Sequence, residues 1–356
     1  MTRSKRASGS PDAGATRSIG VGVVGLGLMG RVHLESYAKA NLAGQPCTLV
    51  AVSDRSADRL DGRIAAQGNL QKDASTARIF DPKVVHTSTD PRAVFEHADV
   101  ELVSICTPTD THVELALAAL AAGKHVLLEK PVSLDAGEIE RLDLAARKAR
   151  RICMPAMCMR FWPGWSWLKD AISDRRYGAV LSASFQRCAS RPAWGQGFYT
   201  DPSRSGGALF DLHVHDVDLV RWLFGDPDSV SSVGSMDHVT TLYRYARGPA
   251  HVAAEGGWNH ADGFPFRMRY VIAFESATAE FDLRREQPLE ITRGGAVEAV
   301  AASAETGYDC EIRHILACVR DGRETADATL AEAAAVTRLL LAEKHDLHPT
   351  RSAKES

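Results

Sequence analysis

The sequence lacks the features of a membrane protein, a disulfide-rich fold or a nucleic-acid binder. No apolar run reaches the roughly 20 residues that cross a bilayer, and no apolar run precedes Gly20 as a secretory signal would require. The seven cysteines are scattered, odd in number and without a Cys-x-x-Cys pair, so neither a disulfide framework nor a structural zinc motif is indicated. A net charge of −3 provides no broad basic field. We expect a cytoplasmic protein with small-molecule partners, bound neither to nucleic acid nor to a membrane.

The chain of 356 residues is long enough for two domains, and its 45% hydrophobic content supplies two cores. Over 19–157, short β-branched runs alternate with helical patterns, which predicts a mostly parallel sheet covered by helices. Over 158–345, longer strands follow one another, with one helix near 206–225 and two after residue 307. This order predicts an α+β domain with a large, mostly antiparallel sheet. We expect disordered tails at 1–18 and 346–356.

A glycine-rich turn follows the first expected strand. In "GLGLMG", Gly25, Gly27 and Gly30 have the Gly-x-Gly-x-x-Gly spacing, and Leu28 and Met29 begin the next helix. The first glycine permits a tight turn, the second lets the backbone approach a pyrophosphate, and the third permits close packing of helix and sheet. This context predicts a Rossmann-type, doubly wound α/β domain that binds a dinucleotide.

The next expected strand ends at Asp54, which is 24 positions after Gly30. A carboxylate there accepts hydrogen bonds from an adenosine ribose and repels a 2′-phosphate, so NAD is favoured over NADP. Arg55 leaves the choice open, because a guanidinium can stack on adenine or bind a 2′-phosphate.

Further along, the segment "SICTPTDTHVELALAALAAGKHVLLEKPVSLDAGE" resembles the glucose–fructose oxidoreductase / inositol dehydrogenase / rhizopine catabolism oxidoreductase family. The family loop Thr-Pro-Asn-x-x-His is matched by Thr107, Pro108 and His112, with Thr109 in place of asparagine. The resemblance implies that this loop contacts the cofactor.

The same resemblance assigns roles to Glu-Lys-Pro at 129–131. It implies that Glu129 lies near the nicotinamide ribose and that Lys130 contacts both the cofactor and the substrate oxygen. We expect a cis peptide before Pro131. Both motifs follow parallel strands, whose carboxyl ends form ligand sites in open α/β sheets.

The stretch "DLHVHDVDLV" at 211–220 has two histidines that could suggest a metal site. On one continuous helix from about Gly206, Asp211, His215 and Asp218 share a face, whereas His213 diverges from His215. We therefore expect no metal here.

The family pattern Asp-x-Gly-x-His is matched by Asp211 and His215, with His213 at the glycine position. The resemblance implies catalysis by Lys130, Asp211 and His215. His215 would be the general base, Lys130 would stabilise the alkoxide, and Asp211 would orient His215 or bind a second hydroxyl. Which of Lys130 and His215 takes the proton stays open.

Four further side chains are expected at the substrate. Arg160 belongs to a family-like Arg-Phe-x-Pro segment, Trp162 and Trp194 could stack on a sugar ring or pack at the domain interface, and His213 could narrow the cleft. The segment 191–207 is expected to be a loop near the cleft.

The resulting hypothesis is an NAD(P)-dependent dehydrogenase that acts on a sugar, inositol or related polyol. The alternatives are an NAD-dependent glycosidase that uses transient oxidation and a non-catalytic NAD(P)-binding sensor. The resemblance also implies a homodimer or homotetramer formed through the C-terminal sheet.

Overall fold

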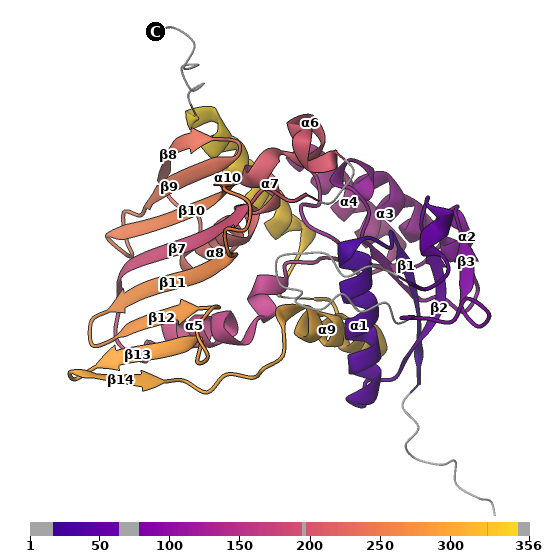
Figure 1. Ribbon diagram of the computed structural model, residues 1–356, viewed down its shortest axis with the longest axis horizontal. Coiled ribbons are helices and arrows are strands. Elements are labelled where there is room, and N and C mark those ends of the chain that lie inside the picture. Colours follow the sequence, from indigo (N-terminus) through magenta and orange to yellow (C-terminus); the bar gives the residue numbers. More distant parts are fainter. Residues whose placement is uncertain (1–16, 64–77, 194–196, 326, 348–356) are drawn as a thin grey trace, which may run out of the picture.

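The computed structural model describes residues 17–63, 78–193, 197–325 and 327–347, which form two adjoining units (Figure 1). The first contains a six-stranded parallel sheet in the order β3-β2-β1-β4-β5-β6. Its strands are β1 (Ile19–Val24), β2 (Cys47–Ser53), β3 (His86–Ser88), β4 (Leu102–Ile105), β5 (His125–Leu128) and β6 (Cys153–Pro155). Every residue of β1, β4 and β6 is buried, which explains their almost uninterrupted apolar sequences.

Helices connect these strands. They are α1 (Leu28–Leu42), α2 (Arg92–Phe95), α3 (His112–Ala121) and α4 (Ala136–Ala149), with the short 3-10 helices η1 (Ala57–Arg59) and η2 (Thr109–Thr111). The predicted doubly wound α/β domain is therefore confirmed, and its ligand edge is formed by the carboxyl ends of β1, β2, β4 and β5.

The second unit contains an eight-stranded sheet in the order β14-β13-β12-β11-β7-β10-β9-β8. Its strands are β7 (Val180–Ser190), β8 (Ser229–Ser235), β9 (His238–Arg244), β10 (His251–His260), β11 (Arg267–Phe274), β12 (Thr278–Asp282), β13 (Leu289–Arg293) and β14 (Ala296–Ala299). The β7–β10 pair is parallel and the other pairs are antiparallel, which confirms the mostly antiparallel prediction.

One face of this large sheet packs on helices and the other does not. The helical elements here are η3 (Cys158–Phe161), α5 (Pro163–Ser173), η4 (Phe198–Thr200), α6 (Pro202–Ser205), α7 (Gly207–Asp211) and α8 (Val214–Phe224). Trp165 of α5 and Leu219 of α8 share a core with Phe185 and Tyr270 of the sheet. We call the opposite side the open face, because no helix of the described chain covers it in Figure 1.

The last two helices return to the first unit. They are α9 (Gly307–Asp321) and α10 (Leu330–Asp346), each with a Thr capping box at its start. Ile312 and Leu316 of α9 and Leu330 of α10 belong to the core that contains β1 and β4. The expected second domain, 158–345, thus includes two helices that complete the first core. Among the described residues, no helix is both long and apolar enough to cross a bilayer.

The expected single helix near 206–225 is wrong, since the chain forms the two helices α7 and α8 there, with the short α6 just before them. Gly206 and Gly207 have φ values of +74° and +68°, which interrupt the helix before α7. A second break follows α7, where the amide of His213 donates to Ala208 O at 2.8 Å. Asp211 and His215 therefore lie on different helices.

Candidate active site

A cavity of about 730 Å³ lies between the parallel sheet and the large sheet. Most of the predicted site residues line it: Gly25, Gly27, Leu28, Met29, Asp54, Arg55, Thr107, Pro108, Glu129, Lys130, Trp162, Asp211 and His215. Gly30, His112, Arg160 and His213 do not line it, and Trp194 lies outside the described residues. The residues predicted to bind a cofactor and those predicted to bind a substrate thus open into one space.

The glycine turn fits a phosphate. Gly25 has a φ of +89°, and a Cβ there would lie 2.7 Å from Cys106 O. A Cβ at Gly30 would lie 2.0 Å from Gly25 O, so both positions exclude larger residues. A Cβ at Gly27 would meet nothing within 4 Å. No side chain caps α1, so its first amides remain available to an anion that approaches over Gly27.

Asp54 secures this turn from the end of β2. Its carboxylate accepts hydrogen bonds from the amide of Leu26 at 2.7 Å and the amide of Ser56 at 2.8 Å. Arg59 donates to the same carboxylate at 3.2 Å. Arg55, Arg59 and Arg63 also line this part of the cavity. The acid therefore shapes the turn in addition to facing the space predicted for the adenosine ribose.

The two family-like loops are tied together behind the cavity wall by His112. Its Nε2 lies 2.8 Å from Thr107 O and its Nδ1 lies 2.9 Å from Pro131 O. Burial lowers the pKa of this imidazole. His112 thus positions both loops from behind the wall and does not face the cofactor space itself.

Glu129 is held by a buried contact with α1. Its carboxylate lies 3.0 Å from Nε2 of His33, and both side chains are almost fully buried. Burial opposes ionisation, but the hydrogen bond from His33 and the charges of His33 and Lys130 together lower the pKa of Glu129. An ionised Glu129 therefore lines the cavity beside Lys130.

Lys130 connects the two units. Its peptide bond to Pro131 is cis, as expected. Its Nζ donates to the main-chain oxygen of Asp211 at 2.7 Å and to Asp211 Oδ1 at 3.2 Å. The carboxylate of Asp211 thus contacts Lys130, and no hydrogen bond to His215 is found within the described residues.

His215 lines the same cavity from the start of α8. Burial lowers its pKa well below 6.5, and the charges of Lys130 and Arg187 add to this effect. Nδ1 of His215 is buried with no hydrogen-bond partner among the described residues. The side chain is therefore a neutral imidazole at neutral pH and can accept a proton.

His213 faces away from the cavity and packs inside the second unit. Its Nε2 lies 3.1 Å from Oε2 of Glu343 on α10, and both side chains are completely buried. Tyr243 donates to the other oxygen of Glu343 at 2.8 Å. A Cβ on Gly256 would lie 2.6 Å from His213 Nδ1, so this glycine makes room for the ring. The expected contact of His213 with the substrate is therefore corrected. His213 instead makes a buried contact between the start of α8 and α10.

Arg160 also differs from expectation, because it forms a buried ion pair. Its guanidinium binds Asp218 through Nη2 at 2.6 Å and Nε at 2.9 Å, and it reaches Glu332 at 2.8 Å. Asp218 is consequently paired with Arg160 and, unlike His215, does not line the cavity. Trp162 lines the cavity and also packs edge-on against Tyr308. It was expected either to stack on a sugar ring or to pack at the domain interface, and its position allows both.

Sequence reasoning missed an arginine and several rings of the cavity wall. Arg187 of β7 lines the cavity and pairs with Asp216 through Nε and Nη2, both at 3.0 Å. Trp258 of β10 also lines the cavity, with Tyr199 packed edge-on against it. The alternation of inward and outward residues along β7 and β10 could have indicated that Arg187 and Trp258 face inward. Tyr199 lies in the loop that was expected near the cleft.

Two family models match the chain: "Oxidoreductase family, NAD-binding Rossmann fold" over 19–157 and "GFO/IDH/MocA C-terminal domain" over 165–280. Levoglucosan dehydrogenase of Pseudarthrobacter phenanthrenivorans is 28% identical over 61% of this chain and 54% of its own length. Myo-inositol 2-dehydrogenase of Thermotoga maritima is 28% identical over 64% of this chain and 65% of its own length. The chain thus matches less than two thirds of the length of either relative.

A solved structure of levoglucosan dehydrogenase in complex with NADH and levoglucosan has a TM-score of 0.78 and 20% identity, and it covers 93% of this chain and 97% of its own. That likeness extends the shared fold to nearly the whole chain. With both domain models matched in their expected order, the chain belongs to the GFO/IDH/MocA oxidoreductase family.

Proposed function

We propose that this chain is an NAD-dependent dehydrogenase that oxidises a secondary alcohol of a sugar, inositol or related polyol, or reduces the corresponding carbonyl. The observation that carries the proposal is the meeting of Lys130, Asp211 and His215 in the cavity that the glycine turn also lines. The family membership and the relatives named as sugar and inositol dehydrogenases support it.

The chemistry divides between two side chains. As an ammonium group, Lys130 has three protons, of which two are engaged by Asp211. The third can hydrogen-bond to the substrate oxygen and stabilise negative charge that develops there. His215 then takes the hydroxyl proton, because its imidazole is neutral and lines the cavity. A bound nicotinamide would supply the acceptor for the hydride that leaves the carbinol carbon.

The cofactor site favours NAD. The open space above Gly27 and the uncapped start of α1 suit a pyrophosphate. Asp54 would face the 2′ position of the adenosine ribose, where its charge disfavours a phosphate. Arg55, Arg59 and Arg63 nearby supply positive charge, so we propose that NADP binds more weakly and is not excluded.

The far wall of the cavity suits a ring with one apolar face. Trp162, Tyr199, Trp258 and Phe266 line it together. Aromatic surfaces of this kind pack against the C–H face of a sugar or cyclitol. The cavity's charged groups are largely paired, as in Arg187 with Asp216 and Arg204 with Asp110, which favours a neutral substrate.

The test is a panel of sugars, anhydrosugars, inositols and dihydrodiols assayed by absorbance of reduced nicotinamide with NAD and NADP. Net reduction of NAD by a simple polyol supports the dehydrogenase. Release of a glycoside aglycone without net reduction would instead identify the transient-oxidation glycosidase. Tight NAD binding with no turnover on any alcohol would identify a sensor.

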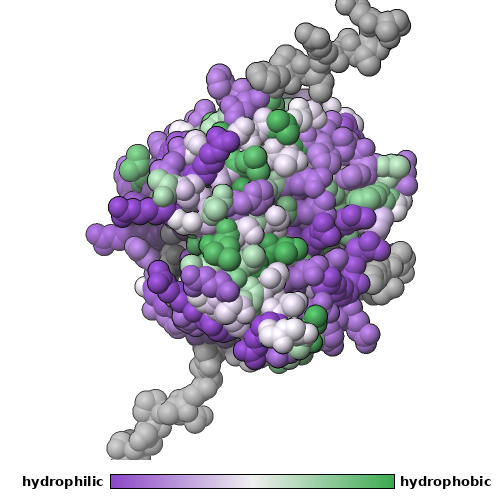
Figure 2. Space-filling model, turned by 90° about the vertical axis from the view of Figure 1, so that its left-hand side faces the viewer, coloured by the Kyte–Doolittle hydropathy of each residue, from purple (hydrophilic) through white to green (hydrophobic). Residues whose placement is uncertain are grey.

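We also propose that the open face joins two copies of the chain, in a dimer or within a tetramer. Figure 2 shows hydrophobic residues gathered near the middle of this face, inside a hydrophilic rim. Exposed Val233, Leu242 and Val271 occupy outward positions on β8, β9 and β11. Light scattering should give a multiple of the chain mass, and Val271→Lys should shift it toward the monomer. A monomeric wild type would contradict this proposal.

We propose that the protein works in a reducing compartment such as the cytoplasm. The free state of all seven cysteines supports this.

A further inference from the structure

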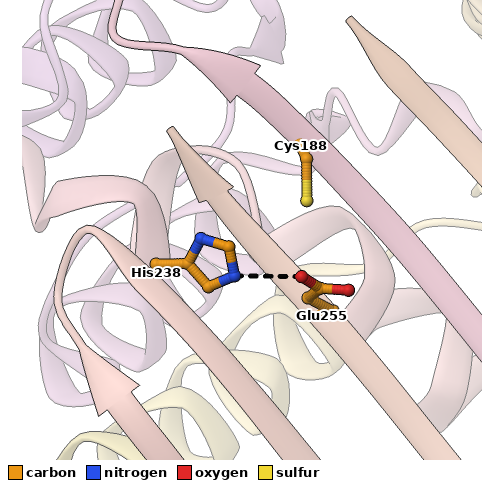
Figure 3. Close-up of side chains that lie close together, drawn as sticks. All are labelled: Cys188, His238 and Glu255. Atoms are coloured by element: carbon orange, nitrogen blue, oxygen red, sulfur yellow. Dashed lines mark hydrogen bonds and ion pairs between the residues drawn. The ribbon is translucent and has the colours of Figure 1, made fainter. Parts of the chain in front are cut away.

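Three side chains with metal-binding atoms meet on the open face, away from the catalytic cavity (Figure 3). They are Cys188 of β7, His238 of β9 and Glu255 of β10, and one ligand atom from each lies within 4.8 Å of the others. His238 Nε2 is 3.0 Å from Glu255 Oε1. Figure 3 shows the sulfur of Cys188 above this pair. Three adjacent strands thus contribute one ligand type each: thiol, imidazole and carboxylate.

The register of the strands explains why these side chains meet. Cys188 pairs with Gly257 of β10, and Gly257 pairs with His238 of β9. A Cβ on Gly257 would lie 2.5 Å from His238 Nδ1, so the missing side chain lets the imidazole lean across β10. Glu255 lies two positions before this glycine, on the same face of the strand.

Other polar groups orient two of the three ligands. Gln186 donates to Glu255 Oε2 at 2.7 Å, which leaves Oε1 directed at His238. Asn259 Oδ1 lies 2.7 Å from His238 Nδ1, which directs Nε2 toward Glu255. Partners of this kind are typical of metal-ligating histidines and carboxylates, because they fix the ring and its tautomer.

The cluster is separate from the proposed hydride chemistry. Arg187 and Ala189 line the catalytic cavity, and Cys188 lies between them on the strand. Because successive side chains of a strand point to opposite faces, the sulfur is directed away from the substrate. An ion held by Cys188 would therefore join strands of the sheet and would not touch the reacting atoms.

We propose that Cys188, His238 and Glu255 bind one divalent transition-metal ion of the zinc class, with water in the fourth position. Thiolate, imidazole and carboxylate together match zinc and disfavour magnesium or calcium, which prefer oxygen ligands only. Binding replaces the thiol proton with a metal–sulfur bond, and the imidazole must offer Nε2 unprotonated. The released protons pass to solvent, and no oxidation or reduction occurs. The ion would tie β7, β10 and β9 together.

The test uses the full chain without an affinity tag, stripped of metal with a chelator. Titration with Co²⁺ should give a thiolate-to-cobalt charge-transfer band in the near ultraviolet that saturates at one ion per chain, and Zn²⁺ should displace it. Cys188→Ser should abolish the band. His238→Gln and Glu255→Gln should each weaken Zn²⁺ binding by about tenfold or more.

Two matched variants, each of which removes a cysteine or a histidine outside the cluster, serve as controls. Cys310 is only partly buried on α9, and His251 is exposed at the start of β10. Cys310→Ser and His251→Gln should keep the band and the affinity. Circular dichroism and NAD binding verify that each variant is folded. An absent band in the wild type, or a band that persists in Cys188→Ser, would overturn the proposal. Equal loss in Cys310→Ser would do the same.

Discussion

Lys130 and Asp211 lie on different units and are joined by two hydrogen bonds, at 2.7 Å to the main-chain oxygen and 3.2 Å to Oδ1 of Asp211. The contact fixes the ammonium group at the boundary between the two units, where we propose that cofactor and substrate meet. Lys130 is thus held by two acceptors of Asp211. A substitution of Asp211 can remove the carboxylate, but the main-chain oxygen remains.

Lys130→Met should lower kcat by roughly 10² to 10⁴, because it removes a cation that acts on developing charge in the transition state. NAD affinity by calorimetry should change little. Asp211→Asn should lower kcat less, since the main-chain hydrogen bond to Lys130 remains. Lys148→Met, at an exposed site on α4, is the control. A Lys130→Met enzyme with wild-type turnover would contradict the assigned role.

The acid limb of kcat/KM for alcohol oxidation should lie below pH 6.5. Burial lowers the pKa of His215, so the neutral base persists as the pH falls past the ordinary histidine value, and activity is lost only at the lowered pKa. His215→Ala should lower kcat by roughly 10² to 10⁴ and abolish this limb. A limb above pH 7 that persists in His215→Ala would assign the proton transfer to another group.

Asp54→Asn should narrow the preference for NAD over NADP. The amide can still accept from the glycine turn, whereas the charge that disfavours a 2′-phosphate is lost and Arg55 and Arg59 remain. Asp54→Ala should narrow the preference as well and weaken both cofactors, because the hydrogen bonds to Leu26 and Ser56 also disappear. Calorimetry with both nucleotides measures this. Tighter NADP binding by the wild type would refute the prediction.

His213→Gly should mainly destabilise the protein. The histidine contacts Glu343 in a completely buried pair, and breaking such a pair costs roughly 3 kcal/mol of unfolding free energy. The Michaelis constant should stay near the wild-type value, since His213 does not line the cavity. Urea unfolding gives the stability. The double variant with Glu343→Gln should lose less than the sum of the single losses. A changed substrate preference at unchanged stability would show that His213 contacts the substrate after all.

Exhaustive treatment with a chelator should leave kcat unchanged. Asp211 contacts Lys130, His215 faces the cavity and His213 contacts Glu343, so these side chains do not converge on an ion. Chelation should lower the thermal midpoint if the site at Cys188 was occupied, because an ion that binds only the folded chain stabilises it. Activity that disappears on chelation and returns with zinc would place a metal in the catalytic site.

The parts of the fold that follow from local patterns were predictable. Apolar runs gave the parallel strands of the first unit, and alternating residues gave those of the large sheet. Two short strands were missed: β3 has three residues at an edge, and all four residues of β14 are exposed, so neither leaves a hydrophobic signature. The return of α9 and α10 to the first core was also missed, because a helical pattern does not specify which core its apolar side joins.

The site shows the same division. The residues of contiguous motifs, Gly27, Lys130 and His215, all line the cavity. His213 and Arg160 could not be placed, because their partners are remote in sequence: Glu343 lies 130 positions after His213, and Asp218 lies 58 after Arg160. The helix that was expected to align Asp211 and His215 is interrupted between them, where the amide of His213 donates to Ala208 O, and left-handed Gly206 and Gly207 interrupt it again before α7. Helical periodicity alone does not register such a break.

Gly256 and Gly257 make β10 the thinnest point of the large sheet, because neither face carries a side chain there. The imidazole of His213 fills the hollow on the helix-covered face, and that of His238 fills the one on the open face. A single added methyl group would therefore act on one side only: Gly256→Ala displaces His213 from Glu343, and Gly257→Ala displaces His238 from Glu255. Substitutions at these two neighbouring positions should therefore have separate effects. A side chain at position 256 would disturb the contact between His213 and α10, and one at position 257 would disturb the cluster on the open face.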